Sequence, residues 1–251
     1  MHIIKLSSMI FCFAYCSLTM AQQEAYEYHN TPNVITNNMQ SNYFVVKNHL
    51  HGNEIYQAVE FEQKWLLDEQ SRGIAQSALN YWLGNDEHKL WLKAHLHKAE
   101  SESSEIDWSI AYRRYLAEFW DVYLGIQQNR QDKHTNFAIA GLHGLAPYFF
   151  ETDVVLYGNH EHIGLNLETS RDFLVTQKLI AQPFINVDMV LKDERESART
   201  VGLAKLNAGM QTRYEITKQV IPFVEFSYRY DQQAEIDKKA WFYGTGINVK
   251  F

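Results

Sequence analysis

The last residues of the chain alternate between two kinds of side chain. From Trp241 to Phe251 every second residue is apolar or aromatic, apart from one threonine, and the residues between them are mostly glycine or polar. A period of two is typical of a β-strand with two different faces. About ten such residues, with aromatic side chains near both ends, have the length of a membrane-spanning β-strand. The pattern predicts that a strand ends the chain and that other strands close a barrel with it.

The same alternation recurs upstream, in about twelve stretches, within a range of ten to fourteen. The expected strands lie at about residues 54–67, 73–83, 90–97, 106–113, 120–127, 135–144, 148–157, 162–168, 182–191, 206–215, 224–230 and 240–251. Longer polar connections tend to interleave with short ones, although those at 158–161 and 172–178 break this rule. The sequence therefore predicts an all-β fold, an antiparallel up-and-down transmembrane β-barrel over residues 53–251. A soluble β-sandwich or lipocalin-like barrel is the alternative.

The N-terminal residues have a different composition. Residues 1–21 combine a basic start, a short apolar stretch and a small-residue cleavage site, which is typical of a secretory signal peptide. A retained anchor and a lipoprotein acylated at Cys16 are the alternatives. Residues 22–52 are polar and lack periodicity, so we expect a flexible periplasmic segment. Both cysteines, Cys12 and Cys16, lie in the leader, so we expect no thiol, disulfide or cysteine-ligated metal in the mature chain.

Composition adds two constraints. The chain has 15 Tyr, 14 Phe and 6 Trp but only 4 Pro, which favours strands and suits aromatic girdles at the two bilayer interfaces. The formal net charge of −7 comes without a basic stripe, which argues against a nucleic-acid partner. We expect the lipids of the outer membrane to surround the barrel.

The faces opposite the apolar ones carry many charges, which would point into the lumen of a barrel. A salt-bridged plug that fills a narrow interior is one interpretation, and a carboxylate-rich path or site for cations is the other. The expected lumen network consists of Lys93, Arg113, Asp121, Glu151, Asp153, Glu168, Asp188, Arg213, Glu215, Glu225 and Arg229.

Three His-x-His pairs are candidate metal ligands. Residues i and i+2 of a strand share a face, so each pair could present two imidazoles to one ion, and imidazole suits copper, zinc and nickel. Solvated loop histidines are the alternative. The pairs are His49 with His51, His95 with His97, and His160 with His162.

Enzymatic activity is not expected. A hydrolytic barrel needs a serine and a histidine close together on one face, and no strand here contains Ser-x-His or His-x-Ser. A pair formed across strands is not excluded by this test.

Several stretches of the chain carry distinctive motifs. They are Trp82–Lys93, Phe119–Asp121, Gly144–Asp153, Leu174–Pro183, Arg213–Ile216 and Pro222–Phe223. The most specific elements are Gly-Leu-Ala-Pro-Tyr and Leu-x-x-Thr-Gln in that order. Together these stretches resemble the copper resistance protein B family of outer-membrane proteins, and the resemblance covers about residues 55–251.

The resemblance implies an outer-membrane β-barrel concerned with copper tolerance, which binds copper ions or mediates their passage. It also implies copper as the ion and periplasmic copper proteins as partners. The chain departs from the family in its N-terminal segment, where residues 22–52 offer only Met39, His29, His49 and His51 as ligands. A structural or general-diffusion barrel with no metal role is the alternative function. We also expect the outer-membrane assembly machinery to recognise the aromatic C-terminus, Phe251.

Overall fold

The computed structural model describes residues 55–99, 104–130, 134–194, 201–234 and 238–251. The predicted signal peptide at 1–21, the segment at 22–52 and the pair of His49 and His51 lie outside the described residues. No helix within the described ranges is long and apolar enough to cross a membrane.

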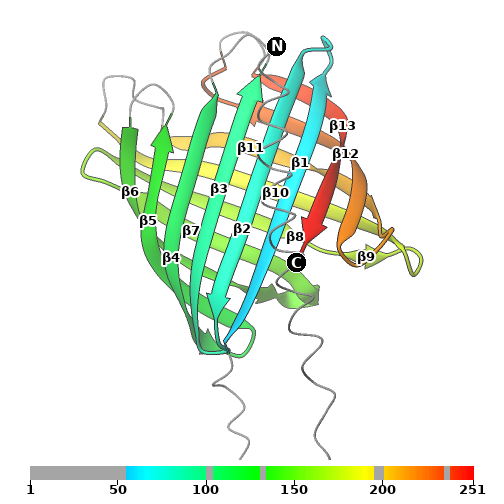
Figure 1. Cartoon of the computed structure of the whole chain (residues 1–251). Helices are drawn as coiled ribbons and strands as arrows, with labels where there is room; N and C mark the ends of the chain where they lie inside the picture. Colours follow the sequence, from blue (N-terminus) through cyan, green and yellow to red (C-terminus); the bar gives the residue numbers. More distant parts are fainter. Residues whose placement is uncertain (1–54, 100–103, 131–133, 195–200, 235–237) are drawn as a thin grey trace, which may run out of the picture. The chain divides into compact units, whose positions relative to one another are not determined.

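Long β-strands make up almost all of the described chain (Figure 1). They follow one another as β1 (Tyr56–Asp68), β2 (Gly73–Gly84), β3 (His88–Ala99), β4 (Glu105–Ala117), β5 (Trp120–Arg130), β6 (His134–Ala146), β7 (Phe150–Gly158), β8 (His162–Ser170), β10 (Leu179–Asp193), β11 (Gly202–Tyr214), β12 (Val220–Asp231) and β13 (Lys239–Lys250). A 3-10 turn, η1 (Pro147–Phe149), and a two-residue strand, β9 (Phe173–Leu174), complete the described elements.

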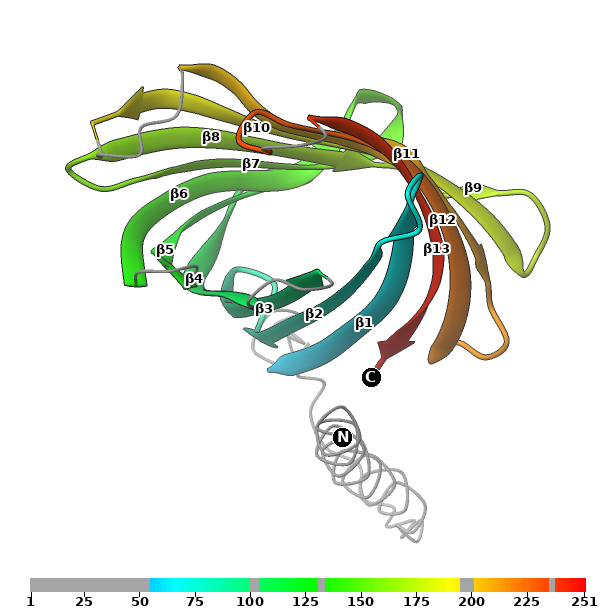
Figure 2. The same ribbon diagram turned by 90° about the horizontal axis from the view of Figure 1, so that it is seen from above.

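The twelve long strands form a closed antiparallel barrel (Figure 2). Each pairs with the next in sequence, except that β8 pairs with β10 across the short β9. The last strand, β13, pairs with β1, where the backbone N–H of Phe251 donates to the carbonyl of Val59 at 2.8 Å. The prediction of an antiparallel barrel of about twelve strands is confirmed. Each of the twelve long strands has a paired neighbour on both sides, as a lipid surrounding requires.

The alternation along each strand separates an apolar outer face from a polar inner face. On β5, Leu124 and Ile126 are exposed on the outside, whereas Asp121 and Tyr123 are buried inside. The aromatic residues Trp65, Trp241 and Tyr243 are also exposed on the outer face, near one rim.

The two rims of the barrel differ. The chain enters β1 and leaves β13 at the same rim, because Glu60 pairs with Lys250. Short turns lie at this rim, including the one between Gly84 and His88. The connections after β10 and β12, which are among the longest, lie at the opposite rim, whereas the equally long connection between β8 and β10 lies at the short-turn rim. In an outer-membrane barrel the short turns are periplasmic and the long loops external.

Two details differ from the strands expected from the sequence. The seventh strand begins at Phe150 rather than at Tyr148, because Tyr148 and Phe149 take φ of 65° and 62° in the turn that follows Pro147. The connection expected at 172–178 contains the two-residue strand β9, which pairs antiparallel with the start of β10.

Candidate functional site

The barrel encloses a polar cavity of about 1870 Å³. Its lining includes nine carboxylates, five Lys or Arg residues and three histidines, so the cavity has a formal excess of negative charge. The carboxylates are Asp68, Glu105, Asp107, Asp153, Glu161, Glu168, Asp188, Glu194 and Asp231. Such a lining in a partly enclosed space attracts cations and disfavours anions.

The cavity reaches only one rim of the barrel. Its lining extends to Asp68, Glu105 and Asp231, which end or begin strands at the rim of the longer connections. None of its lining residues within the described ranges comes from the ends of strands at the short-turn rim. The cavity is therefore a vestibule that faces the exterior side of the membrane.

A bridge across the lumen bounds this vestibule. Lys93 of β3 donates to the carboxylate of Asp153 on β7 at 3.0 Å, and Tyr123 of β5 donates its hydroxyl to the same carboxylate at 2.5 Å. The Lys93 ammonium also lies 4.0 Å from the ring centre of Trp91, a cation–π contact. His143 of β6 packs edge-on against Trp91, with 5.3 Å between ring centres. These five side chains connect strands that are not neighbours in the sheet.

Ion pairs fill the half of the lumen nearer the short-turn rim. Arg113 pairs with Asp121 at 2.5 Å, and Lys89 reaches the same carboxylate at 3.8 Å. Another pair lies near the middle of β12, where Glu225, which is 2% exposed, pairs with Lys64 at 3.0 Å.

Glu225 has further partners, since Arg229 lies 3.5 Å from its carboxylate and Gln211 donates to it at 3.0 Å. A buried carboxylate is tolerated when it is paired and hydrogen-bonded in this way. The described interior thus combines a salt-bridged half with an open half.

The other expected lumen residues are less uniformly placed. Glu168 accepts a hydrogen bond from Asn186 at 2.7 Å, and Asp188 accepts one from Tyr157 at 2.6 Å, both in the cavity. Arg213 pairs with Asp172 of the β8–β10 connection.

Two more of the expected lumen residues, Glu151 and Glu215, lie near the short-turn rim. The side chain of Glu151 is 63% exposed there, 3.6 Å from His143. Glu215 lies in the turn after β11, which ends at Tyr214, so it belongs to no strand face.

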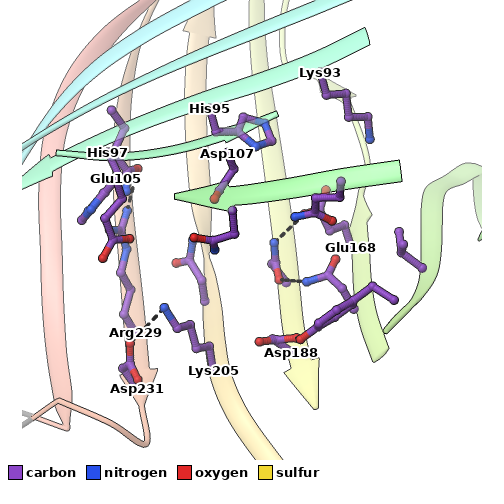
Figure 3. Close-up of a pocket in the computed structure, with 18 of the residues that line it drawn as sticks. Lys93, His95, His97, Glu105, Asp107, Glu168, Asp188, Lys205, Arg229 and Asp231 are labelled. Atoms are coloured by element: carbon purple, nitrogen blue, oxygen red, sulfur yellow. Dashed lines mark hydrogen bonds and ion pairs between the residues drawn. The ribbon is translucent and has the colours of Figure 1, made fainter. Parts of the chain in front are cut away.

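The two histidine pairs that the structure describes differ in whether both imidazoles face the same space. His95 and His97 both line the cavity from β3, as the alternation predicts (Figure 3). The side chain of His160 is 84% exposed in a turn, whereas His162 is buried beside Asp193, with 3.3 Å between ring nitrogen and carboxylate. His160 and His162 therefore do not present their imidazoles together.

The side chains, as they are placed in the structure, do not form a complete metal-binding site. In the part of the chain that the structure describes, no three His, Cys, Asp or Glu residues are grouped so that they could hold a metal ion. Side chains would have to rotate toward an ion in the cavity before they could coordinate it.

Sequence reasoning missed several residues that shape the lumen. Alternation alone places Trp91, Tyr123 and Asp107 on inner faces but does not indicate that they shape the site. His143 lies in a strand rich in Gly and Ala, where alternation does not distinguish the two faces. Their partners lie on strands that are distant in sequence, which a single chain does not reveal.

Three comparisons with known proteins agree with this architecture. A family model described as Copper resistance protein B precursor (CopB) matches residues 56–241. The chain is 26% identical to Copper resistance protein B of Escherichia coli over 195 residues, which are 76% of this chain and 66% of that protein. It is 26% identical to the Copper resistance protein B homolog of Pseudomonas syringae pv. tomato over 148 residues, which are 58% of this chain and 50% of that protein. The matches thus span between half and two thirds of the relatives' own lengths.

Solved porins share the fold. The NanC porin structure superposes with a TM-score of 0.57 at 12% identity, covering 76% of this chain and 100% of that one. The KdgM porin superposes with a TM-score of 0.51 at 8% identity, covering 76% of this chain and 99% of that one. At such identities the similarity concerns the barrel alone.

Proposed function

Because the chain belongs to the copper resistance protein B family of outer-membrane barrels, we propose that it contributes to copper resistance by taking copper ions into its lumen. The observation that carries the proposal is the acidic vestibule with its three imidazoles, His95, His97 and His162. Copper ions are cations that bind imidazole well, so both the charge and the ligand type of the cavity suit them. Binding in the vestibule is the first step, and passage across the membrane is a second step.

Passage would require the far half of the lumen to open. The pair of Arg113 and Asp121 lies in that half, and the bridge between Lys93 and Asp153 lies between it and the vestibule. In the proposal these ion pairs must rearrange before an ion can reach the periplasm. Periplasmic copper proteins would then receive the ion. No covalent chemistry is involved, so the proposal assigns no catalytic residue.

Growth in elevated copper tests the proposal. Cells that lack the protein should grow less well than the parent strain and should contain a different amount of copper. Expression of the wild-type chain should restore both values. Unchanged tolerance together with unchanged cell-associated copper would refute a role in copper resistance.

The ion-paired half of the lumen favours a second candidate, a structural barrel whose interior is closed. Conductance in planar bilayers distinguishes the two. A cation-selective current that changes in Glu151→Gln or Asp153→Asn supports a path, because both carboxylates lie near the ion-paired half. A barrel that stays silent in every variant, in cells with unchanged copper tolerance, supports the closed structural role.

A further inference from the structure

Two neighbouring strands place four potential metal ligands on one patch of the vestibule wall. His95 and His97 lie on the inner face of β3, and the register pairs them with Asp107 and Glu105 of β4. All four line the cavity, and Figure 3 shows them side by side on these two strands. Directly opposite residues have Cβ atoms about 5 Å apart, and the next residue on the same face lies about 7 Å along the strand. We call these four residues the β3–β4 grid.

One oxygen of the grid lacks a partner. Oδ1 of Asp107 is buried and, within the described residues, forms no hydrogen bond. A buried carboxylate oxygen without a partner is costly, and a bound cation would remove that cost. His97 and Glu105 already interact with other groups, so an ion would exchange with those contacts.

The positive side chains near the grid are engaged elsewhere. Figure 3 labels three of them, Lys93, Lys205 and Arg229. Lys93 pairs with Asp153 at 3.0 Å, Lys205 with Asp231 at 3.2 Å and Arg229 with Glu225 at 3.5 Å. These ion pairs hold the three cations on carboxylates outside the grid.

The types of ligand atom in the cavity favour one oxidation state of copper over the other. Thioether and thiolate sulfur are the ligands that favour Cu⁺, whereas imidazole and carboxylate suit Cu²⁺. None of the cavity-lining residues in the described ranges is Met or Cys. The described methionines, Met189 and Met210, are 36% and 49% exposed and lie on the outer face. The vestibule therefore offers nitrogen and oxygen donors.

We propose that the β3–β4 grid is a binding site for Cu²⁺ rather than Cu⁺, with imidazole nitrogens and carboxylate oxygens as its donors. This inference deepens the proposed copper role and rests on it. Tetragonal sites of nitrogen and oxygen are typical of Cu²⁺, which also binds such ligands more tightly than Zn²⁺ or Ni²⁺. The grid supplies four donors from one flat wall, and rotation of the side chains toward a common ion completes the site.

Titration of the refolded full-length barrel with Cu²⁺, followed by electron paramagnetic resonance, tests the site. The wild type should bind one strongly held Cu²⁺ with nitrogen hyperfine structure. His95→Ala/His97→Ala should abolish that signal, and Asp107→Asn should weaken binding by more than ~10-fold, since even loss of an outer partner of a ligand costs that much. His160→Ala, at an exposed histidine outside the cavity lining, is the matched control and should leave binding unchanged. A shift in gel mobility on heating shows that each variant is folded.

The outcomes separate this inference from the proposed function. Unchanged Cu²⁺ binding in the folded His95→Ala/His97→Ala variant would overturn the grid, while a copper-sensitive deletion strain would still support the copper role. Tighter binding of Cu⁺ than of Cu²⁺, measured under reducing conditions with a competing chelator, would overturn the assigned oxidation state. A nitrogen signal that disappears only in the grid variants supports the inference.

Discussion

Neutralising Asp153 should destabilise the barrel, because its carboxylate joins three strands. Asp153 is 6% exposed and accepts hydrogen bonds from Lys93 and Tyr123. In Asp153→Asn the side chain keeps its shape and can still accept from Tyr123. The change removes the negative charge that neutralises the Lys93 ammonium.

The size of the loss follows from the environment of Lys93. A hydrogen bond to a charged group contributes about 1.5 to 3 kcal/mol, and removal of one partner from a fully buried ion pair costs about 3 to 5 kcal/mol. The Lys93 side chain is 25% exposed and retains its contact with Trp91, so solvent and the ring compensate in part. We therefore expect a loss of about 2 kcal/mol in the free energy of unfolding.

Urea unfolding of the barrel in lipid vesicles measures this loss. Lys93→Met/Asp153→Asn should be more stable than Asp153→Asn alone, because it removes the unpaired ammonium. Glu194→Gln breaks a pair in which both side chains are about half exposed, and its effect should stay within about 0.5 kcal/mol. The reasoning fails if Asp153→Asn matches the wild type, or if the effects of the two single changes simply add in the double variant.

Two further changes test packing and assembly. At Gly141 an added Cβ would lie 2.3 Å from Cζ of Tyr123, so overpacking in Gly141→Ala should lower the free energy of unfolding by about 1 to 3 kcal/mol. In the control Gly158→Ala the nearest atom lies 3.0 Å from the added Cβ. Equal losses of stability in the two variants, measured by urea unfolding, would contradict the position of the Tyr123 ring. Deletion of Phe251 should lower the amount of heat-modifiable barrel in membranes, because we propose that the assembly machinery recognises this residue. The control Lys250→Ala should assemble normally. Full assembly without Phe251 would exclude that role.

The fold could be predicted from the sequence because the period of two is a local property. On β3 the alternation places Trp91, Lys93, His95 and His97 on the inner face, and the structure has them there. The exception at Tyr148 comes from backbone geometry, since φ becomes positive for two residues after Pro147. Alternation of side chains does not report such a turn.

The arrangement of the lumen could be predicted only in part. The sequence indicated which charges point inward, but the partner of Lys93 is 60 positions away and is fixed by how the barrel closes. The pair of His160 and His162 shows a second limit, since the spacing holds two side chains together only inside a strand, and β8 begins at His162. The register between β3 and β4, which creates the grid, likewise depends on the connection between the strands.

The most direct test of the account replaces the grid in living cells. Cells that carry His95→Ala/His97→Ala/Asp107→Asn as their only copy, with assembled protein at the wild-type level, should be grown in a series of copper concentrations while cell-associated copper is measured. If the vestibule is where the barrel handles copper, these cells should grow and accumulate copper like cells that lack the protein. Growth and copper content equal to those of the wild type would contradict the account.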